Sequence, residues 1–215
     1  MPEDKKDRYG LFIVLEGIDG SGTTTQINHL HNHIKSLSRY VDVLTTHEPW
    51  RSEEIKRILE EDKDAYSNAE EMTKLYIEDR SRHVNELINA SREHGVNVLS
   101  DRYMMSTFAY QGTQGVSVDA IRKMHQKMGI KKPDLTFFLD VDYEVARDRI
   151  KSRGGDLEKF ESNEEFTRKL IENYRNLVQN EPSLGRIVTI NGNNSIERVA
   201  DEIAENFDLL FRERY

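Results

Sequence analysis

Five short apolar runs along the chain are separated by longer segments in which apolar residues recur every three or four positions. Continuous apolar runs of this length are typical of strands buried on both faces of a parallel sheet. We therefore predict strands at Leu11–Leu15, Val41–Thr45, Asn97–Ser100, Thr136–Val141 and Ile187–Ile190. The three- and four-residue spacing predicts helices at Thr24–Leu37, Ala69–Arg92, Val118–Met128, Glu164–Val178 and Ile196–Phe211. Strands that alternate with helices indicate the α/β class, with helices on both faces of the sheet.

This arrangement also predicts where a ligand binds. Open parallel sheets bind ligands in the crevice outside the carboxyl ends of their strands. The loops of interest are therefore those that follow Leu15, Thr45, Ser100 and Val141. No internal repeat, low-complexity tract or Pro/Gly/Ser-rich linker interrupts the pattern.

Composition narrows the class of protein. The 215 residues correspond to a single domain. With 31 basic and 39 acidic side chains the net charge is −8, which argues against a protein that coats nucleic acid, whereas a small anionic ligand needs only a few local cations. The absence of cysteine excludes disulfides, thiolate metal sites and a cysteine nucleophile. Because no apolar run is long enough to span a membrane and the first ten residues lack a signal-peptide core, we expect a cytoplasmic protein without a membrane partner.

The loop after the first predicted strand has the pattern of a phosphate-binding loop. Its residues are Gly17, Ile18, Asp19, Gly20, Ser21, Gly22, Thr23 and Thr24. Gly17, Gly22 and Thr24 match the P-loop pattern G-x-x-x-x-G-K-[ST], in which backbone N–H groups bind phosphate and the final hydroxyl binds Mg²⁺. Thr23 stands in place of the lysine that normally contacts the β- and γ-phosphates. An ordinary glycine turn is the alternative interpretation of this loop.

Two further segments carry charges suited to the same chemistry. Asp101 and Arg102 follow the third predicted strand, where a carboxylate can act on Mg²⁺ directly or through water and a guanidinium can bind phosphate with two donors. Taken alone, this pair is also compatible with an exposed surface. A basic segment follows the fourth strand, and the alternative for it is an exposed basic helix. Its cations are Arg147, Arg149, Lys151, Arg153 and Lys159.

From about Leu11 to Phe207 the sequence resembles the thymidylate kinases, a family of P-loop nucleoside monophosphate kinases. Four segments carry the resemblance: LEGIDGSG at 15–22, DRYxxSxxAYQG at 101–112, PDLT at 133–136 and the Arg-rich segment that ends at Phe160-Glu161. The second segment is the most specific. The resemblance implies transfer of a phosphoryl group from ATP to dTMP with Mg²⁺, giving dTDP and ADP, a step of dTTP biosynthesis. It also implies a five-stranded parallel sheet flanked by helices, one domain over residues 1–215 with a short lid at about 149–161, and a homodimer.

The resemblance also implies roles for individual residues. The phosphate loop binds ATP, and Thr24 and Asp101 bind the metal ion. Asp19 is similar to the acid that meets the 3′-hydroxyl of dTMP, and Arg102 resembles the residue that binds its phosphate. The remaining residues expected to contact dTMP are Arg51, Tyr76, Arg80, Ser106, Tyr110 and Gln111.

For two of these residues a structural interpretation competes with the functional one. Tyr76 is expected to stack on thymine, and Arg80 lies one helical turn later on the same face. Without the resemblance, the tyrosine would be assigned to the core and the arginine to the solvated surface.

Thr23 raises the question of which group replaces the missing lysine. Some family members carry an arginine inside the P-loop and others carry it in the lid. Position 20 is glycine, so the chain follows the lid pattern, with Arg153 as the first candidate and Arg149 and Lys159 behind it. Three alternatives remain open: another nucleoside monophosphate as acceptor, a deoxynucleoside as acceptor, or a catalytically weak nucleotide-binding regulatory protein.

Overall fold

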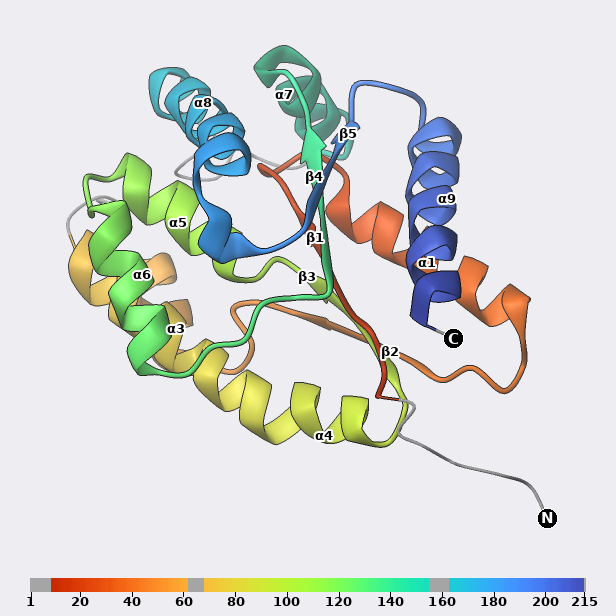
Figure 1. Cartoon of the computed structure of the whole chain (residues 1–215). Helices are drawn as coiled ribbons and strands as arrows, with labels where there is room; N and C mark the ends of the chain where they lie inside the picture. The colour runs from red at the N-terminus through yellow and green to blue at the C-terminus, as the bar shows by residue number, and fades with distance from the viewer. Residues whose placement is uncertain (1–8, 62–67, 155–162, 215) are drawn as a thin grey trace.

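The computed structural model describes residues 9–61, 68–154 and 163–214. Within them, five strands form one parallel sheet in the order β2-β3-β1-β4-β5 (Figure 1). The strands are β1 (Phe12–Glu16), β2 (Val43–His47), β3 (Asn97–Asp101), β4 (Leu135–Asp140) and β5 (Ile187–Asn191). All five predicted strands are therefore confirmed, with ends that differ by at most two residues.

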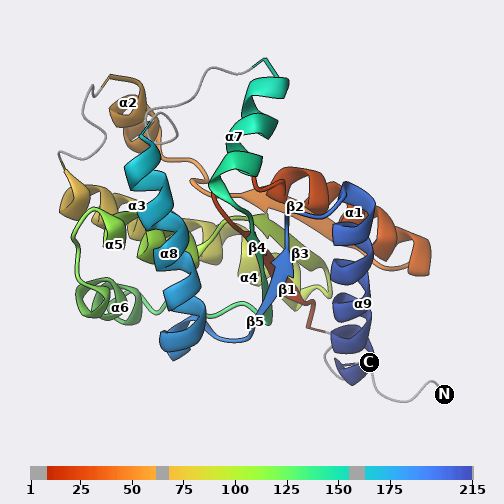
Figure 2. The same cartoon turned by 90° about the horizontal axis from the view of Figure 1, so that it is seen from above.

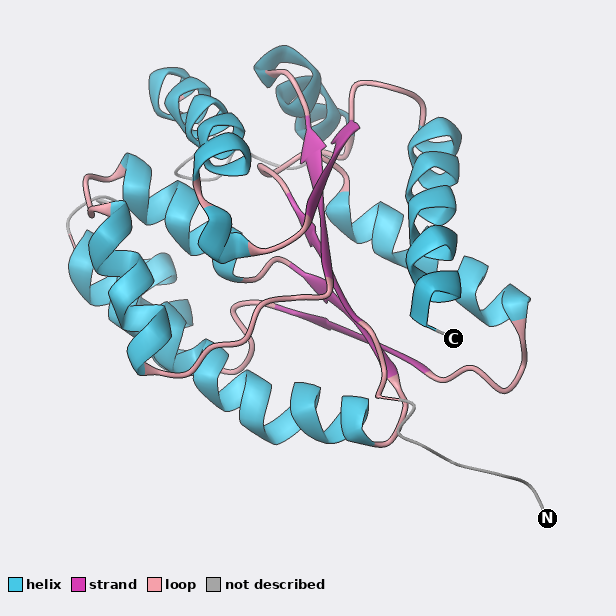
Figure 3. Cartoon of the chain, viewed as in Figure 1, coloured by secondary structure: helices cyan, strands magenta, loops and turns pink. Residues whose placement is uncertain are grey.

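Helices connect the strands and cover the sheet (Figure 3). The first group consists of α1 (Thr23–Leu37), α2 (Glu53–Glu61), α3 (Ala69–His83), the π-helical turn η1 (Val84–Ile88), α4 (Asn89–Glu93) and α5 (Met104–Thr113). The second group consists of α6 (Val118–Lys127), α7 (Tyr143–Ser152), α8 (Glu164–Asn180), the 3₁₀ turn η2 (Pro182–Leu184) and α9 (Ile196–Arg214). None of the helices in the described ranges is long and apolar enough to cross a membrane.

Each face of the sheet has its own apolar core. Alternate residues of β1 point to opposite faces, so Ile13 and Leu15 pack with α1 and α9, whereas Phe12 and Val14 pack on the other side. That second core is covered by side chains of η1, α5, α6, α7 and α8. Figure 2 shows the sheet with α1 and α9 on one side and α5, α6 and α8 on the other. The α/β class with helices on both faces is thus confirmed.

Three helices lie where no helix was predicted. Among the residues of α2, EEIKRILEE, Ile55 is the one fully buried position, so its apolar stripe is weak. Most residues of helix α5 are buried, with polar side chains among them, so its burial does not follow an apolar stripe. Helix α7 occupies the first part of the segment interpreted as a basic lid. The helix predicted at Ala69–Arg92 is continuous, but it contains the π-helical turn η1.

The predicted lid, at about 149–161, is described only as far as Gly154. Residues 155–161, with Lys159 among them, lie outside the described residues. The site below is therefore built from the phosphate loop, the loops that follow β2 and β3, and the end of α7.

Candidate active site

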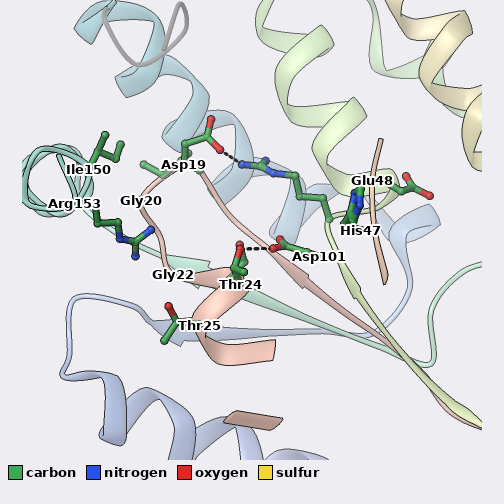
Figure 4. A pocket seen from close by; sticks show the side chains of 13 residues that line it. Asp19, Gly20, Gly22, Thr24, Thr25, His47, Glu48, Asp101, Ile150 and Arg153 are labelled. Atoms are coloured by element: carbon green, nitrogen blue, oxygen red, sulfur yellow. Dashed lines mark hydrogen bonds and ion pairs between the residues drawn. The ribbon is translucent and has the colours of Figure 1, made fainter. Parts of the chain in front are cut away.

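A pocket of about 390 Å³ lies at the carboxyl ends of the central strands (Figure 4). Four segments far apart in sequence meet there: the loop after β1, the end of β2, the end of β3 and the end of α7. The lining residues are Ile18, Asp19, Gly20, Gly22, Thr23, Thr24, Thr25, His47, Glu48, Asp101, Arg102, Ile150 and Arg153. The pocket lies at the edge of the sheet where the sequence predicts ligand binding.

The phosphate loop connects β1 to α1 and leaves the start of α1 open. Gly20 and Gly22 have φ angles of 80° and 99°, a conformation that residues with a Cβ rarely adopt. Gly22 is the N-cap of α1, and no side chain caps its first turn. A helix N-terminus with free N–H groups and a partial positive charge is a suitable site for a phosphate group.

Close packing of α7 explains why position 20 is glycine. A Cβ at Gly20 would lie 2.5 Å from the backbone oxygen of Ala146, which is closer than any ordinary contact. The arginine that some family members carry within the P-loop would therefore displace α7 in this chain. This geometry gives a physical reason for placing the compensating cation on α7 or beyond it.

Thr23 occupies the position of the missing lysine, and a cation from another element faces it. The Thr23 side chain is buried at the first position of α1 and contributes no charge. Arg153, at the end of α7, lines the same pocket and points toward the phosphate loop (Figure 4). The structure thus brings Arg153 and the lysine-less loop together, as the sequence analysis expects.

Arg149 lies differently from Arg153. Its guanidinium donates to the backbone oxygen of Ser21 at 3.3 Å, of Gly192 at 2.8 Å and of Asn194 at 3.4 Å. Burial lowers the pKa of Arg149, and the positive charge of Arg153 acts in the same direction. Arg149 therefore braces the phosphate loop against the loop after β5, and a direct role in catalysis stays a prediction.

The two predicted metal ligands lie side by side. The Thr24 hydroxyl donates to Asp101 Oδ2 at 2.6 Å, at the open end of the pocket (Figure 4). The described residues contain no cluster of three or more Asp, Glu, His or Cys side chains around a common point. One hydroxyl and one carboxylate fit Mg²⁺, which keeps several waters and phosphate oxygens among its ligands. The donor set is therefore suited to a metal ion that arrives with a nucleotide.

Arg102 forms the other wall of the pocket. Its φ angle is 67°, a conformation that is costly for a residue with a side chain and is often found at functional sites. Its guanidinium pairs with Asp19 and lies 5.3 Å from the ring centre of Tyr110. The Tyr110 hydroxyl donates to the same Asp19 carboxylate at 3.2 Å, and burial raises the pKa of this tyrosine. These three residues form a polar cluster beside the phosphate loop.

Arg80 does not line the pocket. It is 2% exposed, and its Nε donates to Glu48 Oε2 at 2.7 Å. Its remaining N–H groups reach the side chains of Thr107 and His125 and the backbone oxygen of Tyr103. Because these donors are occupied by protein acceptors, the structure places Arg80 inside the protein, and its contact with a nucleotide stays a prediction.

Three other residues predicted to contact dTMP are not among the residues that line this pocket. Tyr76 is half-buried, and burial raises its pKa to about 12, so the phenol is neutral at pH 7. Gln111 is buried in α5. Arg51 is exposed and lies over the ring of Trp50 at 4.3 Å, while its backbone N–H donates to Asp79. The roles of all three stay predictions.

The structure shows further polar residues at the pocket and beneath it. His47 and Glu48 line the pocket. The Glu48 carboxylate also accepts hydrogen bonds from His83 and Arg80. Glu16 is fully buried beneath the phosphate loop. A sequence signal existed for Glu16 because a carboxylate that ends a continuous apolar strand, FIVLE, has to be buried with partners.

His125 gives this buried network a predictable pH dependence. Its Nδ1 donates to the Ile121 backbone oxygen and its Nε2 accepts from Arg80, which defines a neutral imidazole. Burial and, in the same direction, the charge of Arg80 lower the pKa of His125 from an ordinary value of 6.5 to about 3.

We expect His125 to reduce the free energy of unfolding as the pH falls below 6.5, because the unfolded chain then binds a proton that the folded protein rejects. At pH 5 the loss attributable to this residue is about 2 kcal/mol. Urea unfolding at pH 7 and pH 5 measures it against His125→Gln, whose amide oxygen can still accept from Arg80. An equal loss in both proteins contradicts the assignment.

Comparison with known proteins finds one family. The family model for thymidylate kinase matches residues 15–203. A thymidylate kinase of Mycoplasma capricolum subsp. capricolum is 34% identical over 202 residues, covering 89% of this chain and 92% of the relative. That of Trichodesmium erythraeum is 35% identical over 212 residues, covering 90% and 93%, and that of Staphylococcus epidermidis is 33% identical over 197 residues, covering 89% and 94%.

Proposed function

The chain belongs to the thymidylate kinase family and is a phosphotransferase, and on that premise we propose that it transfers the γ-phosphoryl group of ATP to dTMP, giving dTDP and ADP. The observation that carries the proposal is the meeting of two anion-binding features in one pocket. The open N-terminus of α1 lies on one side, and Arg102 with its partner Asp19 lies on the other. A donor phosphate chain and an acceptor phosphate therefore have adjacent places to bind.

On the acceptor side, Arg102 holds the phosphate of dTMP through its planar pair of donors. Arg51, on the loop after β2, supplies a second cation from the opposite side. Asp19 accepts from the 3′-hydroxyl of dTMP, while Tyr76, Ser106, Tyr110 and Gln111 line its base and sugar. No general base is needed, because the second pKa of a phosphate monoester is about 6 and the attacking oxygen is already ionised at pH 7.

On the donor side, the backbone N–H groups of the phosphate loop hold the β- and γ-phosphates. Arg153 supplies the positive charge that the lysine at position 23 supplies in other P-loop proteins. Phosphoryl transfer depends mainly on in-line placement of the two substrates and on cations around the transferring group. A lysine-less loop is compatible with catalysis when another cation reaches the same phosphate oxygens.

The functional test is an ADP-release assay with a panel of acceptors: dTMP, dUMP, UMP, CMP, AMP and thymidine. The proposal predicts the highest kcat/KM with dTMP. A higher kcat/KM with another monophosphate or with thymidine would identify that compound as the acceptor instead. Binding of ATP and dTMP without formation of dTDP would identify a regulatory nucleotide-binding protein instead.

We further propose that Thr24 and Asp101 form the metal site. Thr24 and Asp101 would hold the Mg²⁺ ion, which would supply positive charge to the phosphates of ATP. Thr24 contributes its hydroxyl, and Asp101 accepts from it at 2.6 Å, which orients the hydroxyl oxygen toward the pocket.

Thr24→Val is expected to raise the Mg²⁺ concentration needed for half-maximal activity by about tenfold, because one oxygen ligand and the orienting hydrogen bond are lost. Titration of the initial rate with Mg²⁺ at saturating ATP measures this. Thr45→Val, at an exposed position of β2, is the matched control and is expected to leave the requirement unchanged. An unchanged Mg²⁺ requirement in Thr24→Val would show that Thr24 is not part of the metal site.

We also propose a homodimer with one catalytic domain per chain. The resemblance to the family supports this proposal. Light scattering during size exclusion tests it, and a particle with twice the mass of the chain is expected.

A further inference from the structure

Glu16 is a fully buried carboxylate at the last position of β1, immediately before the phosphate loop. Its Oε1 accepts from the backbone N–H groups of Tyr103 at 2.8 Å and Ser106 at 3.1 Å. Its Oε2 accepts from the Ser106 hydroxyl at 2.6 Å and from the Tyr174 hydroxyl at 3.3 Å. One carboxylate therefore accepts four hydrogen bonds from α5 and α8.

Through these bonds Glu16 caps α5 from a different part of the chain. Tyr103 is the N-cap residue of α5, and its own side chain makes no capping hydrogen bond. A carboxylate at this end satisfies N–H groups of the first turn and interacts favourably with the positive end of the helix dipole. The position of the first turn of α5 relative to β1 is thus set by Glu16.

The residue just before this cap is Arg102, and both its backbone and its side chain are tied to the end of β1. Its N–H donates to the Leu15 oxygen at 2.9 Å, in the residue preceding Glu16. Its Nη1 donates to the Ser106 hydroxyl at 3.2 Å, and that same hydroxyl donates to Glu16. The φ angle of 67° at Arg102 is costly, and such conformations persist where several contacts enforce them.

Burying the charge of Glu16 costs free energy, so the presence of a carboxylate at this position is informative. Burial raises the pKa of Glu16 to about 7, whereas the hydrogen bond from Ser106 and the charge of Arg102 act in the opposite direction. A buried neutral side chain would avoid the cost of burying a charge. The arrangement points to a function for a negative group linked to the Arg102 guanidinium through the Ser106 hydroxyl.

We propose that Glu16 is a positioning residue for the acceptor phosphate: it fixes the turn at Arg102 and, through the Ser106 hydroxyl, the direction of the Arg102 guanidinium. The inference rests on the proposed function only in naming the phosphate of dTMP as the group that Arg102 binds. Glu16 itself lies below the pocket and acts through Arg102.

The test compares Glu16→Gln with the wild-type protein. The amide has nearly the same volume and one acceptor oxygen for α5, but it has no charge and presents N–H groups to the Ser106 and Tyr174 hydroxyls. We expect kcat/KM for dTMP to fall by about 10-fold or more, because small displacements of a positioning group have large kinetic effects. The KM for ATP is expected to change by less than about twofold, since the hydrogen bonds of the Glu16 carboxylate go to Tyr103, Ser106 and Tyr174.

A double-mutant cycle shows whether the effect passes through Arg102. In an Arg102→Ala background, Glu16→Gln is expected to lower kcat/KM for dTMP by less than about a further twofold, because the group that Glu16 positions is gone. Ser106→Ala provides a second variant, which removes the linking hydroxyl while the two backbone hydrogen bonds to Glu16 remain. It is expected to lower kcat/KM for dTMP in the same direction. Additive losses in the cycle overturn the proposal.

Glu181→Gln is the matched control for loss of stability. Glu181 is 5% exposed. Like Glu16, it accepts a hydrogen bond from a backbone N–H at the start of a helical turn, here from Ser183 at 3.2 Å. It precedes β5 and therefore lies at the amino ends of the strands, away from the pocket at their carboxyl ends. Its variant is expected to unfold at a lower urea concentration and to keep the kinetic constants of the wild type. Equal kinetic losses in the two variants overturn the proposal.

A readout without substrate separates this inference from the proposed function. The Arg102 Nε–H signal in a ¹⁵N NMR spectrum, assigned by its loss in Arg102→Lys, reports the environment of the guanidinium directly. We expect the signal to shift and to exchange faster with water in Glu16→Gln but not in Glu181→Gln. An unchanged signal in Glu16→Gln overturns the inference even if dTMP is phosphorylated, whereas a wild-type protein that forms no dTDP overturns the proposed function alone.

Discussion

Replacing Arg102 by alanine is expected to lower kcat/KM for dTMP by about 1,000-fold, the size of effect seen when an arginine that stabilises phosphoryl transfer is removed. Arg102 lines the pocket beside the phosphate loop, in a strained backbone conformation and with one carboxylate partner, Asp19. Alanine leaves Asp19 without its cation next to an anionic substrate. Both KM for dTMP and kcat should therefore change, since the same donors bind the acceptor and orient its attacking oxygen.

The measurement is a steady-state ADP-release assay with dTMP varied at saturating ATP. Arg186→Ala is the matched control, because it removes an exposed arginine from an ion pair with Glu213, at the start of β5 and far from the pocket. We expect it to retain the wild-type constants. Arg102→Lys is expected to recover little activity, because a single ammonium cannot reproduce the planar pair of donors. Wild-type kinetic constants in Arg102→Ala would show that Arg102 is not part of the acceptor site.

Replacing Arg153 by alanine is expected to lower kcat by about 100- to 1,000-fold with a smaller change in KM for ATP, as for the loss of one electrostatic donor to a transition state. Arg153 lies at the end of α7 and points toward the phosphate loop, where Thr23 provides no charge (Figure 4). Arg153 lines the pocket beside this loop, and we expect its charge to act on the transferring group there.

Thr23→Lys supplies the complementary variant. In the wild-type background it is expected to leave activity unchanged or to raise it. In the Arg153→Ala background it is expected to restore most of the lost kcat, because a lysine at position 23 brings back the usual P-loop cation. Lys151→Ala, at an exposed position on the same helix, is expected to have little effect. Full activity of Arg153→Ala contradicts compensation by Arg153. A loss of kcat that Thr23→Lys does not restore contradicts it too.

The elements of the sheet were predictable because each strand is buried on both faces. A strand between two layers of helices requires a continuous apolar run, and such runs are visible at Phe12–Glu16 and Leu135–Asp140 without any tertiary information. Helix α5 was not predictable by periodicity. Six of its ten residues are buried, with the polar Thr107 and Gln111 among them, so its burial does not follow an apolar stripe.

The predicted location of the site followed from the topology, but the orientation of individual side chains did not. Arg80 shows the difference. The spacing of Tyr76 and Arg80 placed both residues on one helical face, yet the guanidinium turns inward to Glu48, His125 and the Tyr103 oxygen. Glu48 follows β2 and His125 lies in α6, and no local pattern in α3 indicates either partner.

By itself, the sequence determined the α/β fold, the edge of the sheet that binds ligand, the phosphate loop and the family, because each depends on local patterns of apolar residues, glycines and motif spacing. The tertiary structure decided which charges face one another. Arg153 approaches the lysine-less loop, Arg149 instead braces it, and Glu16 is linked to Arg102 through the Ser106 hydroxyl. These pairings join residues more than 80 positions apart, and their energies depend on burial and on distances of a few ångströms, which only the packed protein defines.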